Sequence, residues 1–349
     1  MLTYLVTAPF TDTVEVFLDT WGRALRNHIE IVTFDDFFGG RPLLTSAVVF
    51  SDLERLSESE RALADTAWQQ LAELEPAPVL FNRPAGVRSR LELLELLYEE
   101  GANAFRAVPL RQAAGRVRYP VFVRHAREHW GALTDLLDEP RALEREVVRA
   151  WLLRRLDSLL AVEFCDTSDA AGIYRKYAAF VVRDMVIPRH LIFDRAWGLK
   201  TPQLLDAGKV AEELRYLEEN PHEQELLRAA RLAGVDYGRL DYALLDGRVQ
   251  IWEVNTNPIV MLHPDAYRPE HLPAQEWFAR RIGEELRRVA TGPAASYRWT
   301  GPAPEGHAQH PSARASLVAF ASDFRPLQRC LWLASDLLRP MLVRRLSRT

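Results

Sequence analysis

The sequence of 349 residues contains only two cysteines, Cys165 and Cys330. Two cysteines are too few for the disulfide framework of a secreted domain, so a reducing, cytoplasmic environment is expected. No run of about 18 apolar residues is present, so no membrane-spanning helix is expected. The first ten residues lack the basic start of a signal peptide, and their short apolar run predicts a β-strand instead.

Lysine is also scarce: Lys176, Lys200 and Lys209 stand in a chain with 44 lysine and arginine residues in total. A GC-rich coding sequence is the simplest explanation, but a lysine retained against such a bias is a candidate for a functional role. The formal net charge is −4, so the strongly basic face of a nucleic-acid-binding protein is not expected. The chain length predicts two or three globular domains.

Short apolar segments alternate with helical patterns over the first hundred residues. Strands are predicted at residues 2–6, 29–32, 47–50 and 79–82. Helices are predicted at 13–27, 57–74 and 89–100, and Ser57 with Glu60 has the spacing of a capping box. This order predicts an α/β domain with a mostly parallel sheet.

The later part of the chain follows a different pattern. Strands are predicted at 119–124 and 159–164, a three-stranded β-meander at 177–193, a hairpin at 242–254 and a helix at 276–289. Residues 291–316 are rich in small and polar residues and predict a linker. The arginine-studded apolar segment 317–349 either packs on its own protein or a second subunit, or lies on an anionic membrane surface.

The most informative stretch is the hairpin around the Asp246-Gly247 turn. Asp241 is expected to open its first strand and Glu253 to close its second, so the two carboxylates meet at one end. Glu253 and Asn255 are two apart on an extended chain and share a face. Two carboxylates packed together without a cation would be costly. These oxygen ligands suit Mg²⁺, with substrate phosphates completing its shell, and predict a metal site.

Gly-Arg-Leu-Asp at 238–241, a hairpin, and then Glu-Val-Asn-Thr-Asn-Pro at 253–258 resemble the closing motif of the ATP-grasp ligases. That superfamily includes D-alanine–D-alanine ligase, glutathione synthetase and ribosomal-protein glutamate ligase. The resemblance implies an ATP-grasp fold of the α/β class, α+β in its ATP-clamping part, behind an N-terminal parallel α/β domain. It also implies ATP, two Mg²⁺ ions on Asp241, Glu253 and Asn255, and a catalytic Arg239 that stabilises an oxyanion.

The resemblance also implies a division of the chain. The expected parts are an N-terminal α/β domain (1–110), a small ATP-grasp subdomain with a flap loop (111–162), a C-terminal subdomain with the metal site (163–290), the linker (291–316) and an amphipathic helical tail (317–349). The flap is expected at 125–131, where the only glycine is Gly131.

Further segments resemble family motifs upstream of the hairpin. Arg124 ends a strand that in the family supplies a phosphate-binding lysine, and 161–165 resembles the hinge that pairs with adenine. The nucleotide contacts that this implies are Arg124, Glu163, Phe164, Cys165, Asp166, Arg175 and Lys200. Lys176 is expected on the opposite face of its strand from Arg175. The candidates for the substrate site are Arg83, Arg88 and Arg189, with Asn82 and His190 beside them.

The reaction implied by the resemblance joins a carboxylate to an amine through an acyl-phosphate. The substrates are small molecules or peptides, a membrane is not expected, and a homodimer is an assembly common among relatives. Two alternatives remain open: an ATP-grasp kinase that phosphorylates a small-molecule hydroxyl, and a nucleotide-binding protein without catalysis.

Overall fold

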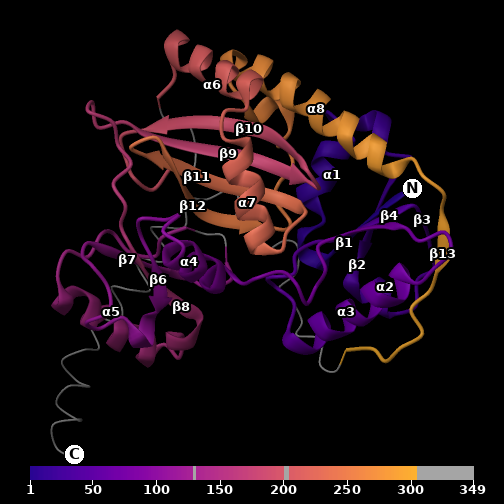
Figure 1. The fold of residues 1–349 in the computed structure, drawn as a ribbon, viewed down its shortest axis with the longest axis horizontal. Helices are drawn as coiled ribbons and strands as arrows, with labels where there is room; N and C mark the ends of the chain where they lie inside the picture. Colours follow the sequence, from indigo (N-terminus) through magenta and orange to yellow (C-terminus); the bar gives the residue numbers. More distant parts are fainter. Residues whose placement is uncertain (129–130, 200–203, 305–349) are drawn as a thin grey trace, which may run out of the picture.

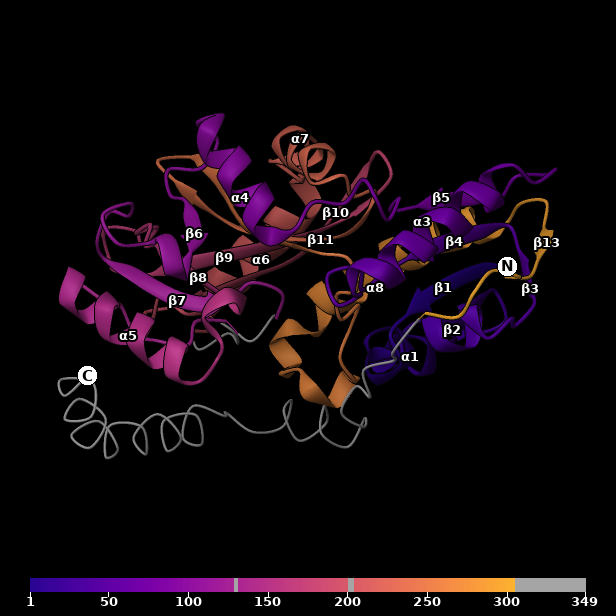
Figure 2. The same cartoon turned by 90° about the horizontal axis from the view of Figure 1, so that it is seen from below.

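The computed structural model describes residues 1–128, 131–199 and 204–304. An N-terminal α/β domain lies at one end of the molecule and a small three-stranded sheet at the other, with a four-stranded antiparallel sheet between them (Figures 1 and 2). The predicted α/β fold with an N-terminal parallel sheet is confirmed. In the described residues, no helix combines the length and the apolar character needed to cross a membrane.

The N-terminal domain is built on a four-stranded parallel sheet. Its strand order is β2 (Ile29–Thr33), β1 (Leu2–Val6), β4 (Ala47–Phe50) and β5 (Val79–Phe81). The helices of this domain are α1 (Asp12–Asp19), α2 (Phe34–Phe38) and α3 (Glu58–Ala72). The predicted capping box is present at the start of α3, where the Ser57 side chain accepts from the Glu60 N–H.

The chain returns to this domain near its described end. Helix α8 (Leu272–Ala290) packs its apolar side, with Phe278 and Ile282, against the strands of the parallel sheet. Strand β13 (Ala295–Tyr297) then pairs with β3 (Leu43–Thr45). The predicted linker at 291–316 is therefore wrong in its first part. Trp299 is buried there because it packs against the aromatic side chains of α2. The rest of that linker and the predicted helical tail at 317–349 lie outside the described residues.

The small sheet has the order β6 (Ala107–Pro109), β8 (Leu159–Glu163) and β7 (Val121–His125), and α5 (Pro140–Leu152) packs on it. Because β6 pairs with β8, this unit begins before the predicted boundary at 111. Helix α4 (Arg90–Glu99) leads from the N-terminal domain into this unit and contacts both β6 and β12. The N-terminal end of α4 therefore lies between the two antiparallel sheets.

The large antiparallel sheet has the order β10 (Met185–Asp194), β9 (Tyr174–Val182), β11 (Tyr237–Leu245) and β12 (Arg248–Asn255). The predicted three-stranded meander is wrong, because β10 continues past its irregularity at Pro188 as one strand. The helices α6 (Ala207–Glu219) and α7 (Glu223–Ala233) cover one face, where Leu240 and Tyr242 are buried. Neighbouring residues point to opposite faces, so Arg239 and Asp241 lie on the other face.

Candidate functional site

A β-bulge sets the register of the hairpin β11–β12. Tyr242 lies opposite Ile251, but the next pair is Asp241 with Glu253, so Trp252 is the extra residue. Without this shift Trp252 would face Asp241. The predicted meeting of Asp241 and Glu253 is therefore present in the strand pairing, although Asp241 lies in the middle of β11 rather than at its start.

Asp241 is paired with cations from its own sheet. Its carboxylate accepts hydrogen bonds from Arg239 Nε at 2.7 Å and lies 2.7 Å from Lys176 Nζ. Burial alone would raise the pKa of Asp241, but Arg239 and Lys176 outweigh it and lower the pKa to about 2. Asp241 is therefore a fully ionised carboxylate at neutral pH.

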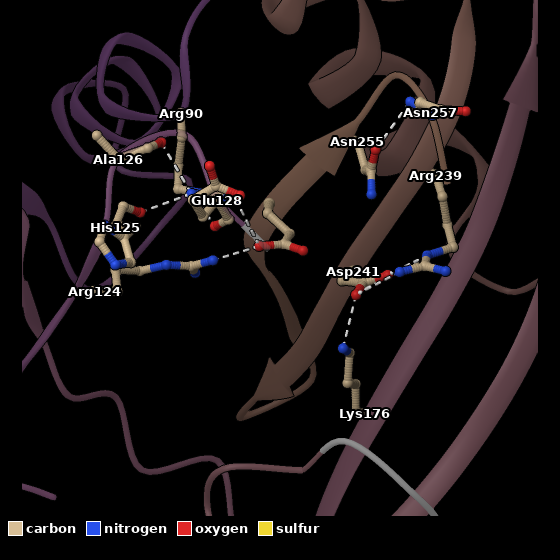
Figure 3. Close-up of polar contacts among 11 residues, drawn as sticks. Arg90, Arg124, His125, Ala126, Glu128, Lys176, Arg239, Asp241, Asn255 and Asn257 are labelled. Carbon is tan, nitrogen blue, oxygen red and sulfur yellow. Dashed lines mark hydrogen bonds and ion pairs between the residues drawn. The ribbon is translucent and has the colours of Figure 1, made fainter. Parts of the chain in front are cut away.

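Glu253 is paired with cations from outside its sheet. Its Oε2 accepts from Arg124 Nη2 of β7 at 2.5 Å and from Arg90 Nη2 of α4 at 3.1 Å. Arg90 Nη1 also donates to the backbone carbonyls of His125, Ala126 and Glu128 (Figure 3). Burial, with Arg124 close by, lowers the pKa of Arg90 to about 10.

We call these six side chains the polar cluster: Lys176, Arg239, Asp241, Glu253, Arg90 and Arg124. Four of them are cationic and two are anionic. In Figure 3, Lys176 reaches Asp241 from below and Arg239 reaches it from above, whereas Arg90 and Arg124 lie together at the left of the view. The cluster therefore has more positive than negative charge and lies where the two antiparallel sheets meet.

Asn255 lies directly opposite Arg239 and is buried. Its Oδ1 accepts a hydrogen bond from the backbone N–H of Asn257 at 2.9 Å, which leaves the second lone pair of this oxygen available. In the described residues, no group of three His, Cys, Asp or Glu side chains could hold a metal ion. The candidate ligand set is instead two carboxylates and one amide oxygen, and these oxygen donors fit Mg²⁺.

His190 of β10 lies near this face of the sheet, since it pairs with Ala178, which in turn pairs with Asp241. Burial and the nearby Arg189 and Arg239 lower the pKa of His190 well below its usual value. The imidazole is therefore neutral at physiological pH and adds no charge to the cluster.

The expected hinge residues lie at the end of β8. Glu163 is buried, and its carboxylate accepts from Arg118 and Arg106, which lower its pKa against the opposing effect of burial. The backbone N–H of Phe164 donates to the Pro120 carbonyl at 2.9 Å. This amide is therefore already used within the protein, which differs from the adenine contact that the family resemblance implies.

The two residues after Phe164 differ in environment. Burial raises the pKa of the Cys165 thiol to about 11, so this cysteine is not a reactive thiolate. The Asp166 carboxylate accepts from the Ser168 N–H, and hydrogen bonds from Ser168 lower its pKa. Neither residue contacts the polar cluster within the described part of the chain.

Three partly exposed aromatic rings gather beside this hinge. The ring of Trp197 lies 4.9 Å from that of Phe122 on β7 and 5.8 Å from that of Phe164, centroid to centroid. Flat apolar faces of this kind pack well against other planar groups.

The structure turns Arg175 away from the polar cluster and Lys176 toward it. Arg175 is paired with Asp169 and Glu212, and its guanidinium lies over the Phe193 ring. The two residues do occupy opposite faces of β9, as expected, but Lys176 is the one beside Asp241. Lys200 lies outside the described residues.

Of the three substrate candidates, Arg83 and Arg88 lie apart from the cluster, whereas burial and the nearby Arg239 of the cluster lower the pKa of Arg189. Arg83 pairs with Asp65 on the surface of the N-terminal domain. Arg88 donates to the Leu232 carbonyl and is exposed. Arg189 is buried, and its guanidinium donates to the Val260 carbonyl, Gln275 Oε1 and Tyr267 Oη. Asn82 joins the start of β11 to the N-terminal domain by hydrogen bonds.

Two members of the polar cluster, Lys176 and Arg90, were not predicted to be there. The scarcity of lysine was a usable signal for Lys176. Arg90 could not be found in this way, because it is one arginine among many and lies 163 residues before its partner Glu253.

Solved structures similar to this chain are ATP-grasp ligases, the superfamily whose closing motif the sequence resembles. ATP-grasp ligase PsnB, complexed with a phosphomimetic variant of its minimal precursor, Mg and ADP, matches at TM-score 0.47 and 16% identity, over 83% of this chain and 97% of that one. D-alanine–D-alanine ligase from Bacillus anthracis, complexed with ATP, matches at TM-score 0.45 and 12% identity, over 82% and 98%. D-cycloserine synthetase DcsG matches at TM-score 0.44 and 16% identity, over 82% and 99%.

No family model matches the chain, and no curated protein is similar to it. Because the structural matches have identities below 25% and TM-scores below 0.5, the chemistry of this chain has to be inferred from its own residues.

Proposed function

We propose that this chain binds ATP with Mg²⁺ at the polar cluster and uses it to join a carboxylate to an amine. The observation that carries the proposal is the cross-strand pairing of Asp241 with Glu253, each of which is bound by two cationic side chains. Oxygen ligands suit Mg²⁺, and surplus positive charge suits a triphosphate.

Asp241, Glu253 and Asn255 are the residues that would hold the metal. When bound, Mg²⁺ neutralises charge on the phosphoryl group that is transferred. In the nucleotide-free chain, the four cationic side chains of the polar cluster neutralise the carboxylates of Asp241 and Glu253. Arg124 and Lys176 are then placed to turn from a carboxylate to a phosphate oxygen, since both side chains end beside a metal ligand.

The proposed reaction has two steps. A substrate carboxylate oxygen attacks the γ-phosphorus of ATP, which gives an acyl-phosphate and releases ADP. The amine nitrogen then attacks the acyl carbon, the bond from that carbon to the phosphate oxygen breaks, and the nitrogen loses a proton to the departing phosphate, so that an amide and phosphate result. Arg239, held in place by Asp241, stabilises the negative charge that develops on the acyl oxygen in this second step.

The rings of Phe122, Phe164 and Trp197 offer a surface for adenine. They lie at the ends of β7 and β8 and just after β10, between the small and large sheets. An aromatic surface gives binding energy through area and stacking without a backbone hydrogen bond. This suits a chain in which the Phe164 N–H is already bonded.

A nucleotide-binding protein without catalysis is the second candidate. The observation that favours it is the double engagement of Glu253 Oε2 by Arg90 and Arg124, where the family pattern has one lysine near this position. Two arginines donate to the same carboxylate oxygen, so a metal ion has to displace both, and this pairing resists exchange more than a single lysine pair does.

An ADP-release assay tests the proposal. The purified chain is incubated with ATP and Mg²⁺, and then with a panel of carboxylic acids and amines. ADP release that requires both an acid and an amine is the expected result. Release with a hydroxyl compound and no amine indicates a kinase. ATP binding without release under all conditions indicates the non-catalytic protein.

A further inference from the structure

The loop after β12 is fastened to the N-terminal domain through Asn257. This side chain is buried, and its Oδ1 accepts hydrogen bonds from Thr13 Oγ1 at 2.7 Å and from Tyr4 Oη at 3.1 Å. Its Nδ2 donates to the Phe10 carbonyl at 3.3 Å. Asn257 therefore uses both ends of its amide on groups that belong to β1, α1 and the segment between them.

Thr256 forms a second attachment beside the first. Its Oγ1 accepts from the Leu53 N–H at 3.1 Å and donates to Glu54 Oε2 at 2.5 Å. Leu53 and Glu54 follow β4 in the N-terminal domain. Thr256 and Asn257 are thus held by neighbouring parts of the N-terminal domain, one after β4 and the other in and after the adjacent strand β1.

One hydrogen bond links Asn257 to the candidate metal ligand Asn255. The backbone N–H of Asn257 donates to Asn255 Oδ1 at 2.9 Å (Figure 3). Because the Asn257 side chain is fixed by three hydrogen bonds, its backbone N–H has a fixed direction. That direction in turn sets the rotation of the Asn255 amide and so the position of its free lone pair.

We propose that Asn257 is a positioning residue, which Thr13 and Tyr4 hold so that it orients the amide oxygen of Asn255 toward a divalent cation. The N-terminal domain is then part of the metal site, although it supplies no ligand. This inference rests on the proposed function. Replacing a group that holds a metal ligand by a hydrogen bond typically lowers metal affinity about 10- to 100-fold.

The polar character of the contact supports a positioning role. The space around Asn257 lies near large apolar side chains, since the Tyr4 ring packs 5.6 Å from the Tyr237 ring. An apolar residue could fill such a space but could not hold a backbone N–H in one direction. Hydrogen bonds in a buried polar network are directional, so they fix geometry more strictly than apolar packing does.

The variant Thr13→Val tests the inference, because it keeps the shape and removes the hydroxyl, which lies within hydrogen-bond distance of both Asn257 Oδ1 and the Phe10 carbonyl. The probes are Mn²⁺ and a non-hydrolysable ATP analogue, and calorimetry measures analogue binding with Mn²⁺ and with EDTA. We expect binding of the analogue in the presence of Mn²⁺ to weaken about 10-fold. Binding of the analogue in EDTA should stay unchanged, and Thr13→Ser should restore Mn²⁺ binding.

Thr20→Val is the matched control, since Thr20 donates to the Val16 carbonyl just after the same helix and lies away from Asn257. Its Mn²⁺ affinity should equal that of the unaltered chain. Equal Mn²⁺ affinity in Thr13→Val and Thr13→Ser would overturn the positioning role, as would equal weakening with Mn²⁺ and with EDTA. An unaltered chain that binds the analogue equally well in Mn²⁺ and in EDTA would instead overturn the proposed function.

Discussion

The two carboxylates of the polar cluster differ in where their partners come from. Asp241 is paired with Lys176 and Arg239, which lie on the same sheet as Asp241 itself. Glu253 is paired with Arg90 and Arg124, which come from α4 and from the small sheet. The ion pairs of Asp241 therefore lie within a single β-sheet, whereas those of Glu253 join the large sheet, the small sheet and α4.

This difference predicts that the ion pairs of Asp241 and of Glu253 respond differently when the small sheet and α4 move against the large sheet. The pairing of Asp241 persists as long as the large sheet is intact, because the sheet fixes the distances between its strands. The pairing of Glu253 depends on how the small sheet and α4 lie against β12. A ligand that enters between the two antiparallel sheets therefore changes the surroundings of Glu253 first.

The largest expected effect comes from Glu253→Gln, which removes the carboxylate that bridges the parts. We expect Mg²⁺-dependent stabilisation by ATP to disappear, a loss of at least about 100-fold in affinity, since a hard cation requires this charged oxygen. A thermal-shift titration with ATP, with and without Mg²⁺, measures it. Unaltered Mg²⁺ dependence in this variant would contradict the assigned site.

Replacement of Arg90 should destabilise the chain next most strongly. Arg90→Gln removes one of two cations from Glu253 and the donor to three loop carbonyls. We expect a loss of roughly 2–3 kcal/mol in the free energy of unfolding, less than for a buried pair broken outright. Urea denaturation measures it, with the exposed Arg83→Gln as control, for which little change in stability is expected because a surface ion pair contributes little.

Lys176→Met and Arg175→Met separate the two faces of β9. The first should weaken binding of ATP with Mg²⁺ roughly 10- to 100-fold, since a hydrogen bond to a charged group is worth about 1.5–3 kcal/mol. The second should change binding little, because Arg175 pairs with Asp169 and Glu212 on the other face. Equal effects of the two substitutions on affinity would remove Lys176 from the nucleotide site.

The smallest expected effect is the pH dependence of Asp241. Its pKa is lowered from 3.8 to about 2 in the folded chain, so its contribution is complete above pH 4 and is lost as the pH falls through 2. We expect roughly 1–2 kcal/mol of stability to be lost between about pH 5 and pH 2.5 from this group. Urea denaturation of the unaltered chain and Asp241→Asn over this range measures it, and parallel pH profiles would contradict it.

The sequence was sufficient to predict the parallel sheet, because strands and helices alternate there with clear caps such as Ser57. It was also sufficient to predict the hairpin, because Asp246-Gly247 marks its turn. It could not determine the register, since a regular hairpin closed by that turn places Trp252 opposite Asp241. Only the bulge brings Glu253 there, and a bulge depends on tertiary packing that alternation of side chains does not encode.

Contacts between segments that lie far apart in the chain were the second feature that could not be predicted from the sequence. The pairing of β13 with β3 lies in a stretch whose composition predicts a loose linker, and burial of Trp299 depends on α2, more than 250 residues earlier. In the same way, Arg83 and Arg88 seemed suited to a substrate by charge alone, but they are bonded to nearby groups on the surface. Charge in a sequence does not tell which side of an element it occupies.

The return of α8 and β13 to the N-terminal domain has a consequence for biosynthesis. When the ribosome has released only the first hundred residues, the surfaces that later bury Phe278, Ile282 and Trp299 are still open to water. The nascent domain then lacks part of its core until translation has passed residue 299. The last packing contacts of this domain therefore form only after both antiparallel sheets have been synthesised, and a chaperone acting during synthesis would protect these early apolar surfaces.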